Sequence, residues 1–420
     1  MGIDVVIIGA GAAGIAAARH LRDRGRQVLL VEAMDRVGGR AHTRIVEGHP
    51  LDLGCGWLHS AERNPLVRFA EAQGAIIDRS PAAWRDQLRN LGFNAADRRA
   101  AWQAFAELEQ NLRRTPPASD CAGDGIAHDH PWRPHLDMIS GALNGAELDL
   151  VSARDMLAYD DNASNANWRL PAGYGTLIAD AAASLPLSLG TKVCAISRNE
   201  RGVAIETGKG RIEASAAIVT VPTDILARGD ITFTPAIDDH LHAAACLPLG
   251  RVDKLFLALA DGEAVPPETH LLGNPRSAKT GSYYLRPFGR PVIECFFGGI
   301  AARSFEEVGD AGRVEFALDE LRQLLGSDFA AGLRPIAGTW WHREPTIGGA
   351  YSHALPGHAD KRGVLAMPPN ERLHFAGEAC STRDYSTVHG AWQSGIAAAK
   401  AVEAMLSLEP KRDAPAPCAS

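Results

Sequence analysis

The stretch Val5-Val6-Ile7-Ile8-Gly9-Ala10-Gly11-Ala12-Ala13-Gly14, near the start of the 420-residue chain, decides the fold. Its four leading apolar residues predict a buried strand, and the alanine-rich residues 12–24 predict a helix. Gly9 permits the tight turn out of the strand, Gly11 lets a pyrophosphate approach the backbone, and Gly14 lets the helix lie close to the strand. This order of strand, glycine turn and helix predicts a dinucleotide-binding site with its phosphates at the helix N-terminus.

An acidic and a basic residue follow at the places that such a site needs. The apolar run Val28–Val31 predicts a second strand, and Glu32 ends it 18 positions after Gly14. A carboxylate there accepts hydrogen bonds from the ribose hydroxyls of adenosine and repels a 2′-phosphate. Gly38-Gly39-Arg40 then offers a guanidinium group to the pyrophosphate, which favours tightly bound FAD over a dissociating nicotinamide.

Composition and cysteine usage narrow the class of protein. The chain has 46% hydrophobic residues and a net charge of −7, so nucleic acid is not an expected partner. Seven cysteines, an odd number, occur without C-x-x-C spacing, which favours reduced thiols in the cytoplasm over disulfides or a zinc site. We expect no signal peptide, no membrane segment and no metal, and the oligomeric state stays open.

The order of predicted elements indicates two interleaved domains. We predict an α/β (α+β) fold in which a FAD-binding, Rossmann-like domain carries an inserted substrate-binding domain. The FAD-binding domain comprises residues 1–80, 171–230 and 336–407, the substrate-binding domain comprises residues 81–170 and 231–335, and residues 408–420 form a flexible tail. The clearest predicted helices are Ala101–Arg114, Val314–Leu325 and Val388–Leu406, the strands are Val193–Ile196, Val203–Thr207, Ile212–Val221, Lys254–Ala260 and Val292–Phe297, and Thr115–Pro131 reads as an exposed loop.

Near its C-terminus the chain returns to the predicted cofactor site. A short strand ends in Gly377-Glu378, which offers a backbone amide and a carboxylate to the ribityl and pyrophosphate region. The helix that begins near Val388 directs the positive end of its dipole at the part of a flavin that becomes negative on reduction. Both ends of the chain therefore contribute to one cofactor site.

Taken together, these segments resemble the flavin-containing amine oxidases, a family that includes monoamine oxidases, polyamine and spermine oxidases and the histone lysine-specific demethylases. The resemblance covers nearly the whole chain and is nearest in motif to the polyamine oxidase branch. It is carried by Gly9–Gly14, Glu32, Gly38–Arg40, Leu51–His59, Leu170–Gly175, Val219–Pro222, Leu249–Lys254, Trp341–Tyr351 and Phe375–Ala391.

The resemblance implies roles for five residues near the reacting atoms. Lys254, at the start of a strand, is expected near flavin N5 through a bridging water, where it assists flavin reoxidation or amine oxidation. Trp341 and Tyr351 are expected beside the isoalloxazine ring. Thr387 stands where many relatives have a tyrosine, which implies half of an aromatic cage, and His59 is expected at the mouth of the active site.

The predicted site consists of catalytic and cofactor-binding residues. The predicted catalytic residues are Lys254, Trp341, Tyr351, Thr387 and His59. The predicted cofactor-binding residues are Gly9, Gly11, Ala13, Gly14, Glu32, Ala33, Gly38, Gly39, Arg40, Gly56, Trp57, Val193, Gly377, Glu378, Thr387 and Val388.

Departures from the family pattern bear on how the cofactor is held. Monoamine oxidases attach FAD through a cysteine that precedes the final Gly-Glu, but residues 342–374 contain no cysteine, and Cys380 does not match that place. The resemblance therefore implies non-covalent FAD. Met34 replaces a basic residue that some relatives carry, which implies fewer contacts on the adenosine side.

The implied reaction is hydride transfer from the carbon α to a neutral amine onto flavin N5. Hydrolysis of the imine follows, and oxygen reoxidises the flavin to give hydrogen peroxide. No general acid–base pair is required, because a desolvated pocket favours the neutral amine and the flavin accepts the hydride.

The sequence leaves the amine and two rival functions open. Asp160-Asp161 and Glu344 would favour a diamine or polyamine if they face the pocket. A histone demethylase is disfavoured because no long helical insertion is present, and an L-amino-acid oxidase needs a carboxylate-binding arginine, for which Arg286 and Arg303 are candidates. A flavin-dependent dehydrogenase with a protein acceptor and a catalytically silent flavoprotein scaffold remain as alternatives.

Overall fold

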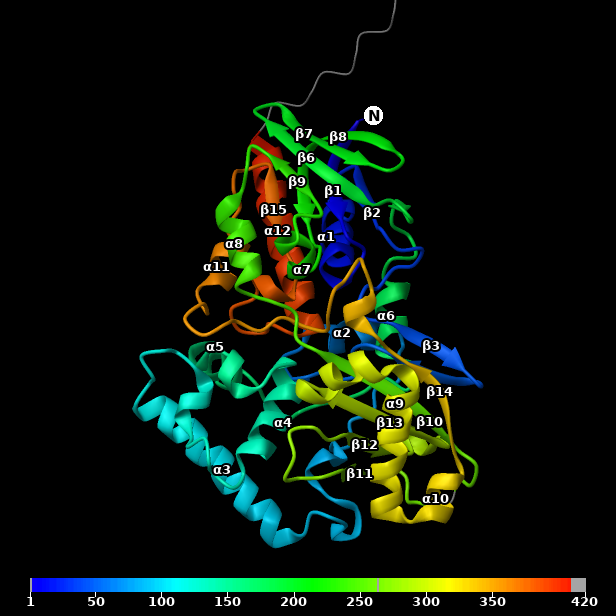
Figure 1. The fold of residues 1–420 in the computed structure, drawn as a ribbon. Helices are drawn as coiled ribbons and strands as arrows, with labels where there is room; N and C mark the ends of the chain where they lie inside the picture. Colours follow the sequence, from blue (N-terminus) through cyan, green and yellow to red (C-terminus); the bar gives the residue numbers. More distant parts are fainter. Residues whose placement is uncertain (1, 263, 409–420) are drawn as a thin grey trace, which may run out of the picture.

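An eight-stranded sheet and a five-stranded sheet organise the chain (Figure 1). The computed structural model describes residues 2–262 and 264–408. The predicted flexible tail at 408–420 falls outside the described residues from position 409 onward. Helices cover both sheets, which confirms the predicted mixed α/β class.

The large sheet contains the predicted dinucleotide-binding unit. Its strand order is β5-β2-β1-β8-β7-β6-β9, with β15 paired to β8, and β1 is parallel to both β2 and β8. The strands are β1 (Ile3–Ile8), β2 (Val28–Val31), β5 (Leu187–Ser188), β6 (Val193–Asn199), β7 (Gly202–Thr207), β8 (Gly210–Val219), β9 (Thr232–Thr234) and β15 (Leu373–Phe375). The carboxyl ends of β1, β2, β8 and β15 meet at one edge, which is where parallel sheets place their ligands.

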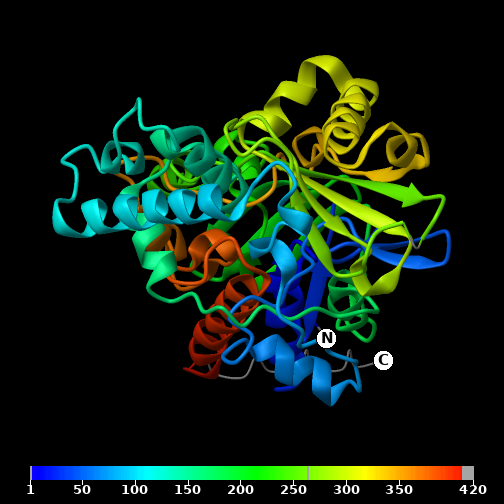
Figure 2. The same ribbon diagram turned by 90° about the horizontal axis from the view of Figure 1, so that it is seen from below.

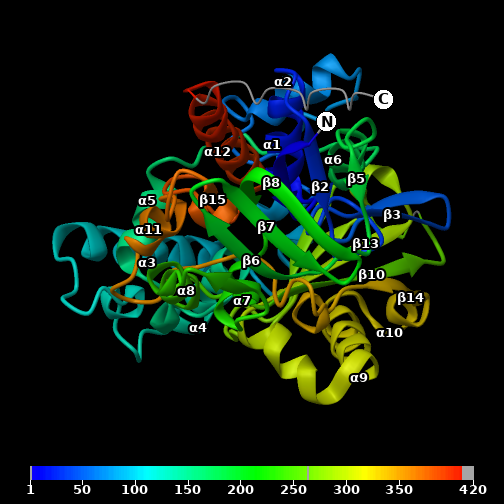
Figure 3. The same ribbon diagram turned by 90° about the horizontal axis from the view of Figure 1, so that it is seen from above.

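Alternate residues of β1 are buried against different helices. Val5 and Ile7 belong to a core with α1 (Ala12–Arg22) and α12 (Val388–Leu408). Val6 and Ile8 face a second core with α7 (Thr223–Ala227), α8 (Asp238–Ala245) and α11 (Lys361–Ala366). A strand buried on both faces is continuously apolar, as the run Val5–Ile8 predicts. Seen from above, α1 and α12 lie side by side along this sheet (Figure 3).

Two glycines between β1 and α1 are required by the backbone conformation and by close packing. Gly9 has φ +105°, a conformation that a residue with a Cβ rarely adopts. A Cβ on Gly14 would lie 1.9 Å from the carbonyl oxygen of Gly9 and 3.1 Å from Thr220 Oγ1. Close packing of α1 on the end of β1 therefore requires a glycine at position 14.

The Gly14→Ala substitution is expected to lower the free energy of unfolding by about 1–3 kcal/mol, because its Cβ collides with rigid backbone. Thermal or denaturant unfolding measures the change. Gly363→Ala is the matched helical control, since no heavy atom lies within 4 Å of its added Cβ, and it should be neutral or slightly stabilising. Equal stability of the two variants would contradict this account of Gly14.

The five-stranded sheet has the order β11-β12-β13-β10-β14 and is antiparallel. Its strands are β10 (Val252–Leu259), β11 (Thr269–Leu272), β12 (Ser282–Leu285), β13 (Val292–Gly298) and β14 (Leu333–Gly338). One face carries Leu255, Leu257 and Ile293 into a core with α9 (Ile300–Leu325), beside which lies α10 (Ser327–Ala331). Because side chains alternate along a strand, Lys254 points to the opposite face.

Three predicted segments differ from the structure. The helix expected at 101–114 begins earlier, at Ala95. The helix expected at 314–325 begins earlier, at Ile300, and α9 contains a break at Gly309, where φ is +69°. The segment 115–131 is not simply an exposed loop, because Ala122 is fully buried and the Asp120 carboxylate accepts a hydrogen bond from Ser152 Oγ. A polar segment with a buried capping carboxylate resembles an open loop in composition alone.

A helical layer and two smaller units complete the described chain. The layer consists of α3 (Ala95–Arg114), α4 (Arg133–Asn144) and α5 (Ala153–Asp160), and in the view from below α3 lies at the edge of the molecule, away from α9 (Figure 2). The smaller units are the hairpin of β3 (Thr43–Val46) and β4 (His49–Asp52), and the helices α2 (Pro65–Ala72) and α6 (Tyr174–Asp180).

The sheets extend slightly past the predicted domain limits. Strand β9 starts at Thr232 and pairs with β6 of the large sheet, and β14 starts at Leu333 and pairs with β10 of the smaller one. The two-domain division stays a proposal. Its limit near 230 moves past α8, whose Ala243 and Ala244 pack in the core of the large sheet, and its limit near 335 moves past β14, which ends at Gly338.

Three further observations concern the residues that the structure describes. None of their helices is long and apolar enough to cross a membrane. They contain no group of three or more His, Cys, Asp or Glu side chains arranged to hold a metal ion. Cys55, Cys121, Cys194, Cys246, Cys295 and Cys380 are free thiols, and Cys418 lies outside the described residues.

Candidate active site

One cavity of about 980 Å³ lies between the carboxyl edge of the large sheet and the face of the smaller sheet that carries Lys254. It brings together residues from both ends of the chain. The predicted site residues that line it are Gly9, Gly11, Ala13, Glu32, Ala33, Gly38, Gly39, Arg40, Gly56, Trp57, His59, Val193, Lys254, Trp341, Tyr351, Gly377, Glu378, Thr387 and Val388. Gly14 does not line the cavity, and its place is behind Gly9, where α1 meets β1.

Glu32 is held at the cavity wall by the glycine turn. Its carboxylate accepts hydrogen bonds from the Ala10 amide at 2.6 Å and from the Met34 amide at 2.9 Å. Burial raises the pKa of Glu32, and these two amides oppose that rise. A carboxylate fixed in this way, at the end of β2, has the position that ribose recognition requires.

The first turn of α1 and Arg40 form an anion-binding wall. Ala12 and Ala13 line the cavity, and the amides of a first helical turn have no carbonyl partner within the helix. A Cβ on Gly11 would meet no atom closer than 4.0 Å, so the space in front of this backbone is open. Arg40 Nη1 donates to the Ala350 carbonyl at 2.7 Å, whereas its Nε and Nη2 have no partner within residues 2–262 and 264–408. These residues fit the pyrophosphate of a dinucleotide.

Glu378 lines the cavity, and its carboxylate oxygens have partners within the chain. Its Oε1 accepts hydrogen bonds from Arg40 Nη1 at 2.9 Å and from the Ser352 amide at 3.1 Å. Its Oε2 accepts from Ser352 Oγ at 2.7 Å and from the Ser386 amide at 2.9 Å. Burial disfavours the ionised form, but the charges of Arg40 and Arg362 hold the pKa of Glu378 below its ordinary value. The carboxylate therefore orients Arg40 and the turn before α12.

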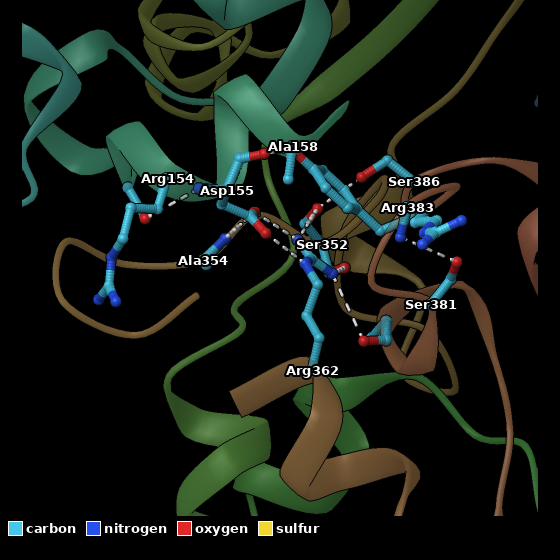
Figure 4. A network of polar contacts seen from close by, with 12 residues as sticks. Arg154, Asp155, Ala158, Ser352, Ala354, Arg362, Ser381, Arg383 and Ser386 are labelled. Carbon is cyan, nitrogen blue, oxygen red and sulfur yellow. Dashed lines mark hydrogen bonds and ion pairs between the residues drawn. The ribbon is translucent and has the colours of Figure 1, made fainter. Parts of the chain in front are cut away.

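A buried ion pair continues this network into the helical layer (Figure 4). Arg362 in α11 donates from Nε to Asp155 Oδ1 at 2.7 Å and from Nη2 to Oδ2 at 2.8 Å. Its Nη1 donates to Ser352 Oγ at 2.9 Å, and its guanidinium group lies 3.7 Å from the ring centroid of Tyr385. Since Asp155 belongs to α5, the network joins the helical layer to Glu378 through Ser352.

Lys254 enters the cavity from β10. Its side chain is 8% exposed, and Nζ lies 2.9 Å from the carbonyl oxygen of Asp52 and 2.6 Å from Glu294 Oε1. The backbone amide of Lys254 donates to Thr339 Oγ1 at 2.8 Å, which fixes the strand at this point. Glu294 also lines the cavity, so the lysine and its carboxylate partner face the same space.

Trp57, Trp341 and Tyr351 line the cavity, and other groups fix each of them. Trp57 packs against Trp84 with ring centroids 4.2 Å apart. The Trp341 amide donates to Asp253 Oδ1 at 2.9 Å. The Tyr351 hydroxyl donates to the Ala142 carbonyl in α4, so it is not free to bind a ligand as a donor.

Thr387 and His59 hold structural contacts at the cavity. Thr387 Oγ1 donates to the Asp384 carbonyl at 2.6 Å and accepts from the Gly390 amide at 3.0 Å, which is the geometry of a helix N-cap. His59 Nδ1 lies 2.7 Å from Asn167 Oδ1, and burial lowers the pKa of this imidazole.

The structure separates the acidic candidates. Asp160 lines the cavity together with Glu109, whereas Asp161 pairs with Arg113 at 2.7 Å and is not part of the lining. Burial and the neighbouring Glu109 raise the pKa of Asp160 to about 7. Glu344 is also absent from the lining.

Neither candidate arginine for a substrate carboxylate reaches the cavity. Arg286 Nη1 donates to the Val265 carbonyl at 2.8 Å, and Arg303 pairs with Glu147. The lining of the cavity includes neither residue. Neither arginine is therefore placed to bind a substrate carboxylate in this cavity, as an L-amino-acid oxidase would need.

The cavity residues that were not predicted from the sequence include Glu294, Glu109 and Trp84. The strand Val292–Phe297 was predicted, but its register against β10, which brings Glu294 to Lys254, depends on long-range pairing. Glu109 lies in a predicted helix, but the residue types of that helix do not indicate which of its sides faces the cavity. Trp84 falls in a segment with no periodic signal.

Comparisons with known proteins agree with this geometry. The chain is 29% identical to polyamine oxidase 4 of Oryza sativa subsp. japonica over 431 residues, covering 94% of this chain and 88% of that protein. It is 27% identical to a lysine-specific histone demethylase 1 homolog of Arabidopsis thaliana, of which it spans only 51%. Among solved structures, cyclohexylamine oxidase from Brevibacterium oxydans matches with a TM-score of 0.80 and 22% identity, covering 97% of this chain and 100% of that one. A putrescine oxidase double mutant matches with a TM-score of 0.80 and 20% identity, covering 96% and 99%.

The family match extends over almost the entire chain. The model of the flavin containing amine oxidoreductases matches residues 12–403, a range that starts in the dinucleotide turn and ends in α12. That range includes Lys254, Glu378 and the aromatic residues of the cavity. The chain therefore belongs to the flavin-containing amine oxidoreductase family.

Proposed function

We propose that this protein oxidises small amines with FAD held in the cavity. The single observation that carries the proposal is continuity: one cavity runs from Gly11, Glu32 and Arg40 to Lys254 and Trp341. FAD held there would supply the hydride acceptor for oxidation of the carbon next to the amine nitrogen. The residues of the chain would bind the cofactor, orient the amine and exclude water.

The residues of the chain have separable tasks in this proposal. The α1 N-terminus and Arg40 bind the pyrophosphate, and Glu378 orients Arg40. The aromatic rings of Trp341 and Tyr351 orient the amine and exclude water, which favours the neutral form of its nitrogen. Lys254 contributes a fixed cation close to the reacting groups.

FAD is held non-covalently. Among the described cysteines, Cys55 lines the cavity, and burial raises the pKa of its thiol, with the charge of Asp52 adding to the rise. A thiol is a poor nucleophile when its pKa is raised, because only the thiolate attacks. Cys380, which follows Glu378 in the chain, is not part of the lining.

The substrate class is diamines or polyamines. Support comes from Glu109 and Asp160, two carboxyl groups at the same cavity as Lys254, which suit a second ammonium group of the substrate. The names of the relatives agree, since polyamine oxidases of rice match along 94% of the chain. We further propose that oxygen is the electron acceptor and that the products are an imine, which water hydrolyses, and hydrogen peroxide.

A cytoplasmic location belongs to the same proposal. The free thiols at six described cysteines favour a reducing compartment. Fractionation of the native host with an antibody against the chain tests this location independently of activity.

A panel of amines tests the function. The purified yellow protein is mixed anaerobically with monoamines, diamines and polyamines, flavin bleaching is recorded, and peroxide is then measured after air is admitted. Bleaching followed by peroxide supports an oxidase, whereas bleaching with dye reduction and no peroxide indicates a dehydrogenase. No bleaching by any amine would contradict amine oxidation and leave the scaffold alternative.

The Asp160→Asn substitution is expected to lower kcat/KM for 1,4-diaminobutane about tenfold near pH 8, because an ionised partner of the distal ammonium is lost. n-Butylamine, which lacks that group, should be affected little. Since the raised pKa of Asp160 is about 7, the preference of the native protein for the diamine should grow as pH rises through that value.

Asp161→Asn is the matched control, because this neighbour pairs with Arg113 outside the cavity. Near pH 8 it should leave kcat/KM unchanged for both the diamine and the monoamine. Equal losses for diamine and monoamine in Asp160→Asn would show that Asp160 does not discriminate between them.

A further inference from the structure

The contact between Lys254 and Glu294 places a carboxylate beside the lysine that is expected near the flavin. Nζ of Lys254 and Oε1 of Glu294 are 2.6 Å apart, and the two side chains are 8% and 23% exposed. Both residues line the cavity. Lys254 has one further partner, the Asp52 carbonyl, within the described chain, which leaves its third N–H directed at neither group.

The register of the smaller sheet makes this contact a fixed part of the fold. Lys254 is paired with Phe296 across β10 and β13, and Glu294 is two positions away on the same strand as Phe296. A diagonal pair on one face of an antiparallel sheet lies within reach of long side chains. The pair therefore depends on the sheet and not on a loop.

Other charged groups near the pair are directed elsewhere. Asp52 is the second carboxyl group close to Lys254, but Thr43 Oγ1 and the Tyr174 amide donate to its oxygens. Arg290 also lies in this region and donates to the carbonyl oxygens of Pro50 and Pro171. Glu294 is thus the described carboxylate that contacts the Lys254 ammonium directly.

We propose that Glu294 is a positioning residue that holds the Lys254 ammonium in one place and cancels its charge, so that a cationic amine can enter the cavity. The proposal rests on the proposed function, and it adds a condition on the net charge of the cavity that receives the amine. An isolated ammonium in a poorly hydrated cavity repels a second cation strongly, because Coulomb forces grow as the effective dielectric falls. Paired with a carboxylate, Lys254 adds little net field at the distance of an entering cation, whereas a group in direct contact with its ammonium still meets a positively charged N–H donor.

The charge of the pair predicts opposite effects for the two single substitutions. Glu294→Gln leaves the ammonium alone and should weaken the binding of a cation. Lys254→Met leaves the carboxylate alone and should strengthen it. The double substitution restores a neutral site, and its affinity should return close to that of the native protein.

Binding is measured with tert-butylamine, which has no hydrogen on the carbon next to nitrogen and is therefore not oxidised. Perturbation of the flavin absorption spectrum reports its Kd, and tert-butyl alcohol serves as the neutral probe of the same shape. We expect the amine Kd to rise about tenfold in Glu294→Gln, to fall about tenfold in Lys254→Met, and to stay within about twofold in the double variant. The alcohol Kd should stay nearly constant in all of them.

Two results would overturn the proposal. If the double variant binds the amine as weakly as Glu294→Gln, the carboxylate contacts the amine itself and does not act through Lys254. If the three variants all bind like the native protein, the pair has no influence on the charge of the cavity. Glu307→Gln, on the exposed side of α9, controls for a general loss of one negative charge. Because the probe is bound and not turned over, the result stands apart from any failure to find an oxidisable amine.

Discussion

Replacement of Lys254 by methionine is expected to slow the oxidation of the reduced protein by oxygen on the order of 100-fold while FAD stays bound. Transfer of electrons to oxygen creates negative charge, and Lys254 is the cation of β10 that lines the cavity. Methionine keeps the length of the side chain, removes the ammonium and leaves the negative charge of Glu294 unpaired, and both changes oppose negative charge on the oxygen. The rate is measured by stopped flow, as the return of flavin absorption after reduced protein is mixed with oxygenated buffer.

Lys400→Met provides the control for this experiment. Lys400 lies exposed on α12, so its loss should leave the rate unchanged. An unchanged rate in Lys254→Met, with FAD content equal to that of the native protein, would remove the role given to this residue. Loss of FAD from the variant would instead indicate that Lys254 contributes to cofactor binding.

Arg362→Met is expected to lower the free energy of unfolding by about 3–5 kcal/mol, since it leaves the buried Asp155 carboxylate without its counterion. Arg362 and Asp155 are 1% and 4% exposed, so water cannot replace the missing partner. Stacking on Tyr385 is lost as well. Denaturant unfolding of the FAD-loaded protein, followed by far-ultraviolet circular dichroism, measures the change.

Two comparisons separate this effect from a general loss of an arginine. Arg211→Met removes ion pairs with Glu206 and Glu213 at the surface, where all three side chains are at least 43% exposed, and should cost less than about 1 kcal/mol. The double substitution Asp155→Asn with Arg362→Met should recover part of the loss, because the unpaired charge is gone. A small effect of Arg362→Met would mean that Asp155 is already neutral or hydrated.

The dinucleotide half of the site was predictable because its demands are local. Gly9, Gly14 and Glu32 occur within one strand–helix–strand unit, so their spacing along the chain determines their spacing in space. The same locality explains the strands Val28–Val31 and Val292–Phe297, whose apolar runs match the structure.

The contacts that adjust the site were not predictable from the sequence. Glu294 reaches Lys254 only through strand pairing across 40 positions of chain, and nothing in either segment specifies that register. Glu378 lines the cavity and its role in cofactor binding stays a prediction, but its contacts with Arg40, Ser352 and Ser386 could not be foreseen. A sequence motif indicates where a carboxylate lies in the chain, whereas the groups that donate hydrogen bonds to it come from distant segments.

Cofactor capture has to wait until the segment from Gly377 to Val388 has been synthesised. The ribosome makes Gly11 and Glu32 first, but Glu378 and Val388, which line the same cavity, come near the end. The last helix is also seated directly on the first, since a Cβ on Gly395 would lie 2.1 Å from the carbonyl oxygen of Ala13. A nascent chain that ends before α12 therefore lacks the part of the cavity wall that Val388 contributes and leaves a face of α1 uncovered. A premature stop codon late in the gene should consequently yield a colourless, aggregation-prone product although most of the fold has been made.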